Sequence, residues 1–181
     1  MDDASLVRDC LSGSEKACKA LFDRYAPAML AMCVRYSSSR PEAEDNLQEG
    51  FIKIFQNLEK WKSTGALGAW IRRVILNTCL TKIQTSHKEK MSIPDSELPE
   101  LLSEPEVISS LAYRDIIHLI DTMPLGYRTV FNLHMIDGHS YQEIAGMLQI
   151  TESTCRSQVL RAKKFLANKI TRANSNIKVE L

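Results

Sequence analysis

The sequence predicts an all-α protein of two small helical domains joined by a flexible acidic linker, the second domain containing a helix-turn-helix. Apolar residues recur at helical spacing on both sides of the chain centre. The 181 residues include only seven Gly and six Pro, which disfavours a turn-rich all-β fold. Residues 86–105 contain three Pro and no aromatic residue, a composition typical of a linker.

Length and composition narrow the class of protein. Charged residues make up 25% of the chain and hydrophobic residues 44%, which excludes a wholly disordered, collagen-like or coiled-coil protein. No run of about 18 apolar residues is present, so we expect no membrane insertion. Residues 1–3 are Met-Asp-Asp and lack the hydrophobic segment of a secretory signal, which favours a cytoplasmic location.

The domain bounds follow from these patterns. We expect a first domain over residues 1–85, a linker over residues 86–108, a second domain over residues 109–173 and a tail over residues 174–181. The five cysteines are scattered, odd in number and form no CxxC pair, so neither a disulfide framework nor a zinc site is expected. They are Cys10, Cys18, Cys33, Cys79 and Cys155.

In the first domain, Ser14 is a suitable cap for a helix that begins at Glu15. A later helix is expected over residues 41–58, because Pro41 and the acids that follow suit a helix N-terminus. Its core stripe is Leu47, Phe51, Ile54 and Leu58. Its opposite face carries Asp45, Gln48, Glu49, Ile52 and Gln56. That face is either a protein-docking surface or a solvated face with one stray Ile.

A further helix is expected over residues 67–84, with two distinct faces. Leu67, Ile71, Val74 and Ile75 point inward. A second stripe combines an aromatic ring, a cation and short polar groups: Trp70, Arg73, Asn77, Thr81 and Gln84. Such a surface can stack bases, bond base edges and hold phosphate. The alternative is that Trp70 is an ordinary core residue.

Charge is unevenly distributed although the net charge is only +1. Residues 51–90 contain eight basic residues against two acidic ones, and residues 153–178 contain seven basic residues and no acid. Between them, residues 91–110 contain five acids and no base. Two basic modules around an acidic spacer suggest two contacts with one polyanion, whereas each basic run alone is also typical of a solvated helix face.

The second domain contains the most specific pattern. Residues 125–135 form an apolar-periodic helix that Asp137 and Gly138 end. Ser140 and Glu143 form an S-x-x-E capping box that opens a short helix over residues 141–148. After a tight turn, Thr151 caps a long basic helix. A short helix, a tight turn and a longer basic helix predict a helix-turn-helix, rather than a plain helical hairpin.

The long helix has a core stripe at positions 155, 159, 162, 166 and 170. Its first exposed residues are placed to meet base edges and phosphates, because that is where a helix-turn-helix contacts DNA. Those residues are Ser153, Thr154, Arg156 and Ser157. Arg161, Lys163 and Lys164 lie farther along and are expected near backbone phosphate.

Taken together, these motifs resemble those of bacterial sigma factors of the extracytoplasmic-function (ECF) type, over nearly the whole chain. Residues 43–51 (AEDNLQEGF) resemble the family's motif for docking on core RNA polymerase, and residues 70–77 (WIRRVILN) its promoter-melting helix. Residues 140–145 (SYQEIA) and 154–162 (TCRSQVLRA) resemble its helix-turn-helix for the −35 element. Two such modules in this order and spacing make a specific pattern.

The resemblance implies a role for each stripe. It implies polymerase contacts by Asp45, Leu47, Gln48, Glu49 and Ile52. It implies −10 DNA contacts by Trp61, Lys62, Trp70, Arg72, Arg73, Asn77, Thr81 and Lys82. It implies −35 DNA contacts by Thr151, Ser153, Thr154, Arg156, Ser157, Arg161, Lys163 and Lys164. The acidic linker is implied to thread the polymerase cleft toward the RNA exit path.

Two departures from the family pattern bear on these roles. Gln149 stands in the turn where many members have Gly, which predicts some strain or an altered turn geometry. Thr81 and Gln84 replace an Asp and an Arg that are common in the family, which affects the details of −10 recognition.

We therefore expect a transcription initiation factor that binds core RNA polymerase and promoter DNA and helps to open the duplex. The resemblance also implies an anti-sigma partner, which in this family is often membrane-bound. The alternative is a helix-turn-helix regulator that acts without a holoenzyme. An enzyme is disfavoured, because the four His lack metal-ligand spacing and no phosphate-binding glycine loop is present. No catalytic residue, metal or cofactor is expected.

Overall fold

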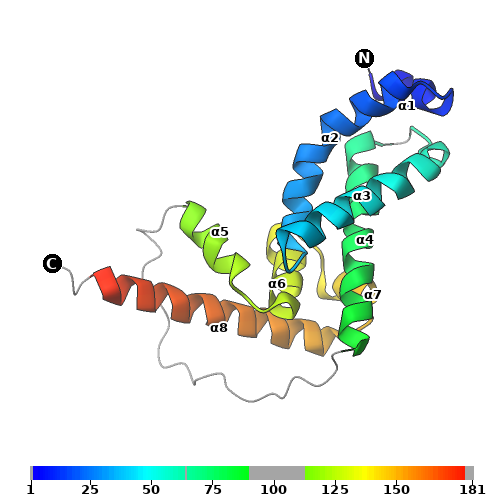
Figure 1. Cartoon of the computed structure of the whole chain (residues 1–181). Helices are drawn as coiled ribbons and strands as arrows, with labels where there is room; N and C mark the ends of the chain where they lie inside the picture. The colour runs from blue at the N-terminus through cyan, green and yellow to red at the C-terminus, as the bar shows by residue number, and fades with distance from the viewer. Residues whose placement is uncertain (1, 64, 90–112, 178–181) are drawn as a thin grey trace. The chain divides into compact units, whose positions relative to one another are not determined.

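The computed structural model describes residues 2–63, 65–89 and 113–177, and within these ranges every regular element is a helix. The chain divides into two compact units, Met1–Glu89 and Lys90–Leu181. The expected all-α fold is confirmed (Figure 1). The acids of the expected linker, Asp95, Glu97, Glu100, Glu104 and Glu106, lie outside the described residues.

The first unit is built from four α-helices and one short 3₁₀ turn. They are α1 (Asp3–Leu11), α2 (Glu15–Arg35), α3 (Arg40–Gln56), η1 (Leu58–Lys60) and α4 (Leu67–Glu89). Ser14 caps α2, since its side chain accepts a hydrogen bond from the Ala17 N–H at 3.3 Å. Ser39 caps α3 by accepting from the Glu42 N–H, and Pro41 stands in the first turn. Both helix starts agree with the sequence.

The α2, α3 and α4 helices pack against one another around the core of this unit (Figure 1). The predicted stripe of α3 is confirmed, because its four residues are between 0% and 7% exposed: Leu47, Phe51, Ile54 and Leu58. Leu58 lies in η1, because α3 ends two residues earlier than predicted. The inward face of α4 is also confirmed, with Leu67, Ile71 and Ile75 at 0% exposed and Val74 half-buried.

Gly50 explains how closely α3 and α4 approach. A Cβ atom at this position would collide with the side chain of Ile75 and would lie 3.5 Å from the Ile75 Cα. Glycine costs about 1 kcal/mol in a helix relative to alanine. Here that cost is offset because the absent side chain lets the backbone of α3 reach α4.

All five cysteines are free thiols, and two of them meet in the core of the first unit. The Cys79 thiol on α4 donates to the Cys33 sulfur on α2, with the two sulfurs 3.8 Å apart. This hydrogen bond lowers the pKa of Cys33 and, together with burial, raises that of Cys79. Both side chains are 0% exposed, so they act as small core residues.

The second unit is built around one long helix. Its elements are α5 (Tyr113–Asp121), α6 (Leu125–Phe131), η2 (Asn132–Ile136), α7 (Tyr141–Leu148) and α8 (Glu152–Ile177). The α8 helix contacts α5, α6 and α7 (Figure 1). The core includes Ile120, Met123, Phe131 and Ala162. The predicted stripe of α8 holds for Cys155, Val159 and Ala162, whereas Leu166 and Ile170 are half-buried.

The α4 helix continues to Glu89, five residues beyond its predicted end at residue 84. In the second unit, one element differs from the sequence prediction in its type of helix. Residues 125–135 are expected to form a single α-helix, but residues 132–136 adopt a π-helical turn. The helix then ends as predicted at Asp137 and Gly138, where the glycine has a φ of +77°. A π-helical turn adds a residue to the helical repeat and so changes the direction of the following side chains.

Candidate nucleic-acid interface

The exposed face of α3 carries four of the five polar and apolar residues predicted for it. Asp45, Gln48, Ile52 and Gln56 are exposed, and Ile52 is 56% exposed. Leu47 is only 7% exposed and belongs to the core stripe. A polymerase contact by Leu47 stays a prediction, at a side chain that the structure buries.

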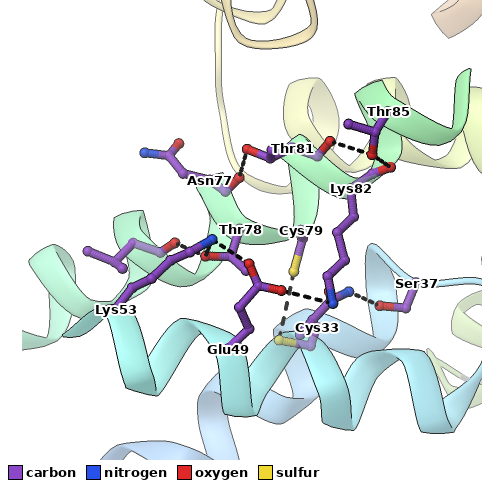
Figure 2. Close-up of polar contacts among 12 residues, drawn as sticks. Cys33, Ser37, Glu49, Lys53, Asn77, Thr78, Cys79, Thr81, Lys82 and Thr85 are labelled. Carbon is purple, nitrogen blue, oxygen red and sulfur yellow. Dashed lines mark hydrogen bonds and ion pairs between the residues drawn. The ribbon is translucent and has the colours of Figure 1, made fainter. Parts of the chain in front are cut away.

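Glu49 lies at the edge of this face, between two lysines. Its carboxylate is 2.6 Å from Lys53 Nζ on the same helix and 3.1 Å from Lys82 Nζ on α4, as Figure 2 shows. The Lys53 ammonium, and then that of Lys82, lowers the pKa of the Glu49 carboxyl. Glu49 thus bridges α3 to α4 instead of pointing away from the unit with Gln48 and Ile52.

A groove of about 330 Å³ lies beside this bridge. It is lined by residues from the end of α3, from η1 and from α4: Lys53, Asn57, Lys60, Trp70, Val74, Asn77, Thr78 and Thr81. Trp70 is half-buried there, so it is neither a core residue nor a fully exposed one. One aromatic ring, two lysines and several amide and hydroxyl groups converge on this groove.

Two threonines of α4 line the groove. The Thr78 hydroxyl donates to the Val74 carbonyl at 3.0 Å, and the Thr81 hydroxyl donates to the Asn77 carbonyl at 2.8 Å (Figure 2). Each hydroxyl hydrogen is therefore used within the helix, which leaves lone pairs of the exposed Thr81 for a ligand, whereas Thr78 is only 2% exposed. Lys53 Nζ already lies 3.4 Å from the Thr78 oxygen. The groove can bond amino groups of a base as well as phosphate oxygens.

Only three of the eight residues predicted for the −10 contact line this groove: Trp70, Asn77 and Thr81. The Trp61 indole donates to the Gly65 carbonyl at 3.2 Å instead of lining the groove. Lys62 and Arg73 are exposed, Arg72 is half-buried, and Lys82 is engaged by Glu49.

Five further residues that line the groove were not predicted from the sequence. They are Lys53, Asn57, Lys60, Val74 and Thr78. Lys53 lies in the last turn of α3, Asn57 directly follows that helix and Lys60 lies in η1. No helical spacing in the sequence groups them, because the tertiary packing of α3 and η1 beside α4 brings them together.

The helix-turn-helix of the second unit is assembled from short-range contacts. The Ser140 hydroxyl accepts from the Glu143 N–H at 3.2 Å, and the Glu143 carboxylate accepts from the Ser140 N–H at 2.8 Å. The hydrogen bonds that the Ser140 N–H and hydroxyl donate to the Glu143 carboxylate hold its pKa below the usual range. The predicted capping box is confirmed.

The turn between the two helices is left-handed at Gln149, with a φ of 56° and a ψ of 42°. Side chains other than glycine rarely adopt this conformation, so the left-handed turn is kept at Gln149 and strain there stays a prediction. Thr151 then caps α8, since its hydroxyl oxygen accepts from the Thr154 N–H at 3.1 Å.

The hydroxyl groups at the start of α8 bond to one another. The Thr151 oxygen lies 2.8 Å from the hydroxyl oxygens of both Ser153 and Thr154, and the Ser157 hydroxyl donates to the Thr154 carbonyl. The exposed residues among those predicted for the −35 contact are Thr151, Ser153, Arg156, Ser157 and Lys163. Thr154, Arg161 and Lys164 are half-buried.

Arg156 is the cation nearest the start of α8. Its guanidinium lies 3.2 Å from the Glu152 carboxylate and 5.5 Å from the ring centre of Tyr141. The sequence analysis missed Leu160, which is 56% exposed one turn beyond Arg156. Its signal is its position outside the core stripe. An exposed apolar side chain among cations can contact the methyl group of thymine.

Neither a metal site nor a membrane-spanning helix is found in the part of the chain that the structure describes. Within those residues, no three His, Cys, Asp or Glu side chains are grouped so that they could hold a metal ion. The described helices also include none with the length and apolar character needed to cross a membrane.

Comparison with known proteins assigns both units. Residues 113–166 match the family described as sigma-70, region 4, and residues 21–89 match sigma-70 region 2. The chain is 28% identical to the ECF RNA polymerase sigma-E factor of Haemophilus influenzae, with 94% of this chain and 96% of that protein covered. It is 26% identical to the Escherichia coli K12 protein of the same description, with 94% and 95% covered.

A solved structure has the same fold. It is the sigma factor RpoE of Bartonella quintana, solved in complex with the anti-sigma factor NepR. The RpoE chain is 21% identical to this chain, with a TM-score of 0.51. The alignment covers 84% of this chain and 96% of that one. With region 2 in the first unit and region 4 in the second, the chain belongs to the ECF RNA polymerase sigma factors, non-enzymatic proteins that direct RNA polymerase to promoters.

Proposed function

We propose that this sigma factor divides promoter recognition between its two units. The groove of the first unit takes single-stranded DNA of the −10 element, and the start of α8 reads the −35 duplex. The exposed face of α3 docks on core RNA polymerase. The domain bounds of this proposal are residues 1–85 and 109–173, with the intervening segment as linker and residues 174–181 as a tail.

The groove carries the −10 proposal. A base separated from its partner exposes both ring faces and its hydrogen-bonding edge, and Trp70 offers a ring beside the acceptors of Asn77 and Thr81. Lys53 and Lys60 line the same groove and supply charge for the phosphates. We keep Trp61, Lys62, Arg72, Arg73 and Lys82 as −10 contacts along the strand outside the groove.

The −35 proposal rests on the start of α8. In a helix-turn-helix, the first residues of the second helix enter the major groove of DNA. Ser153, Arg156 and Ser157 are exposed there, and Arg156 is the side chain able to bond guanine through two nitrogens. Thr151, Thr154, Arg161, Lys163 and Lys164 complete the surface, with the three later cations near phosphate.

The docking proposal rests on Asp45, Gln48 and Ile52. These three side chains are exposed on one face of α3, where an apolar residue stands among polar ones. Glu49 contributes through its bridge to Lys53 and Lys82, which fixes α3 against α4. Because core polymerase works in the cytoplasm of bacteria, we place the protein there.

The proposal as a whole is tested by transcription in vitro. Core polymerase lacking any sigma factor is combined with this protein on a library of genomic fragments from the same organism. We expect start sites that appear only when the protein is present, and their aligned upstream sequences give both promoter elements. Sequence-specific DNA binding without any initiation would contradict the proposal.

Docking is tested by the double variant Asp45→Lys with Ile52→Asp. Reversing one charge and adding another at the centre of the face should weaken co-elution with core polymerase by about tenfold or more. Asp23→Lys is the matched control, since Asp23 is an exposed acid of α2, outside residues 43–51, that pairs with Lys19. Equal co-elution of the double variant and the control would contradict the docking assignment.

We further propose an anti-sigma partner, and its test distinguishes a partner in the cytosol from one anchored in the membrane. The RpoE structure of Bartonella quintana, which has the same fold, is described as a complex with an anti-sigma factor. Cytosolic and solubilised membrane fractions of the native cell, added to the transcription assay, provide the test. Inhibition that disappears when excess sigma factor is added supports the partner, and no inhibition by either fraction contradicts it.

A further inference from the structure

The three residues His134, Tyr141 and Arg156 form a stack across the helix-turn-helix. The His134 and Tyr141 rings lie with their centres 4.2 Å apart and their planes 24° apart. The Arg156 guanidinium carbon lies 5.5 Å from the centre of the Tyr141 ring. His134 lies in η2, Tyr141 in α7 and Arg156 in α8, so the stack joins these three elements of the second unit.

The Tyr141 end of this stack is held in place from two sides. His134 Nδ1 lies 2.9 Å from the His139 carbonyl oxygen, and because a carbonyl only accepts, the imidazole nitrogen donates. Tyr141 itself directly follows Ser140, whose capping box with Glu143 fixes the start of α7. Tyr141 is half-buried, and its ring lies against His134.

The Arg156 end is mobile unless something restrains it. Arginine has a long side chain with many rotamers, and the side chain of Arg156 is 65% exposed. The Glu152 carboxylate restrains it from one side, 3.2 Å from the guanidinium. The Tyr141 ring lies against it from α7 and attracts its charge. A guanidinium that is already oriented loses less freedom when it bonds a base.

We propose that Tyr141 is a positioning residue for base reading by Arg156. The Tyr141 ring, supported by His134, restrains the guanidinium in the orientation in which it meets the −35 duplex. This inference rests on the proposed function of Arg156 as a base contact. It assigns to α7 an indirect part in specificity, carried by a residue outside the recognition helix.

The test is a double-mutant cycle on the complete holoenzyme. The probe is duplex DNA carrying the −35 element mapped by transcription, together with its single base-pair variants. The variants are Arg156→Ala, Tyr141→Leu and their combination. The quantity measured is the discrimination ratio, which is the affinity for the mapped element divided by that for each base-pair variant. Because both affinities come from one preparation, partial unfolding cancels from the ratio.

We expect Arg156→Ala to identify one or two base pairs at which discrimination falls. At those base pairs alone, Tyr141→Leu should lower discrimination by about two- to fivefold, the size of an exposed contact between a cation and a ring. When Arg156 is already Ala, Tyr141→Leu should change nothing further. Tyr141→Phe should retain discrimination, because the ring remains.

Two control results separate this role from others. Tyr127→Leu removes another half-buried tyrosine of the same unit, which packs on the core cluster, and should leave every discrimination ratio unchanged. If Tyr141→Phe loses as much as Tyr141→Leu, the hydroxyl rather than the ring acts, and the inference is overturned.

Further outcomes distinguish the inference from the proposed function. If Tyr141→Leu changes discrimination as strongly with Ala at position 156 as with Arg, the coupling is absent and only the inference fails. The same holds if the loss is equal at all base pairs. If Arg156→Ala changes no discrimination ratio, the base contact itself is absent and both fail.

Discussion

The groove of the first unit and the start of α8 both gather polar and basic side chains, but they draw them from the chain differently. The groove combines Lys53 and Lys60 with Trp70 and Thr81, from elements that meet only through tertiary packing. The surface of α8 comes from consecutive turns of one helix. The residues that cap this helix and orient its side chains lie within about 25 residues of them in the sequence. One surface therefore depends on how closely two helices approach, and the other depends on local capping and turn geometry.

The two regions also differ in how their cations are held. In the groove, Lys53 is engaged by Glu49, which also engages Lys82 from α4. On α8, Arg156 is engaged by Glu152 of its own helix and by the Tyr141 ring. In the first case an ion pair joins two helices, so it contributes to the fold. In the second case the contacts mainly orient one side chain.

Gly50→Ala should give the largest effect, and only in the first unit. The added Cβ meets Ile75 across the α3–α4 contact, and overpacking a core of this kind costs about 1–3 kcal/mol. The gain in helix propensity of about 1 kcal/mol offsets part of that loss. Chemical unfolding followed by tryptophan fluorescence measures it, since both Trp61 and Trp70 belong to this unit.

Gly146→Ala is the matched control in the second unit. Gly146 lies inside α7, and a Cβ there would meet nothing within 4 Å. The same substitution should therefore stabilise by about 0.5–1 kcal/mol through helix propensity alone. Stabilisation by Gly50→Ala, or destabilisation by Gly146→Ala, would break the comparison between a tertiary and a local site.

Gln149→Gly should stabilise the turn of the helix-turn-helix. A residue other than glycine in the left-handed conformation costs about 1–2 kcal/mol, and Gln149→Gly removes that cost. Part of this gain in stability is lost because glycine has more conformational freedom in the unfolded chain. We expect a net gain of about 0.5–1 kcal/mol, measured by hydrogen exchange of the α7 and α8 amides. Gln142→Gly, at an exposed position of α7, should have the opposite sign. A loss of protection in Gln149→Gly would show that the turn is not strained.

Glu49→Gln should have the smallest effect, and it should depend on pH. Because the folded-state pKa of Glu49 is lowered from its ordinary value of 4.5, its contribution is present above that pH and is lost as the pH falls through the lowered value. The pair is 41% exposed at Glu49, so we expect only a few tenths of a kcal/mol at neutral pH. The stability difference between wild type and variant should shrink on acidification, and a constant difference would contradict the ion-pair role.

Local signals explain why the helix-turn-helix was predictable. The Ser140–Glu143 box and the Thr151 cap each depend on residues no more than three positions apart in the sequence, and both are confirmed. Gln149 marks the turn and has a left-handed conformation in the structure. The groove was only partly predictable. Trp70, Asn77 and Thr81 follow from the periodicity of one helix, whereas Lys53 and Lys60 depend on which helix lies beside it.

Two further differences have the same origin. Leu47 satisfied both a core stripe and a family motif, and only packing decides that it is buried. Glu49 belongs by periodicity to the exposed face, yet Lys82 from α4 draws its carboxylate into a bridge. The π-helical turn at residues 132–136 has no local sequence signal of the kind that marks caps and turns.

The division of labour between the two surfaces is tested most directly by comparing Trp70→Ala with Arg156→Ala holoenzymes on one mapped promoter. Opening is followed by the fluorescence of 2-aminopurine in the −10 element, and base discrimination is followed at the −35 element. Because Trp70→Ala removes one stacking platform, we expect promoter opening to fall about fivefold or more while −35 discrimination is unchanged. Trp70→Phe should retain activity. Arg156→Ala should lower −35 discrimination and leave opening of the bound promoter intact. Loss of the same step in both variants would contradict the account.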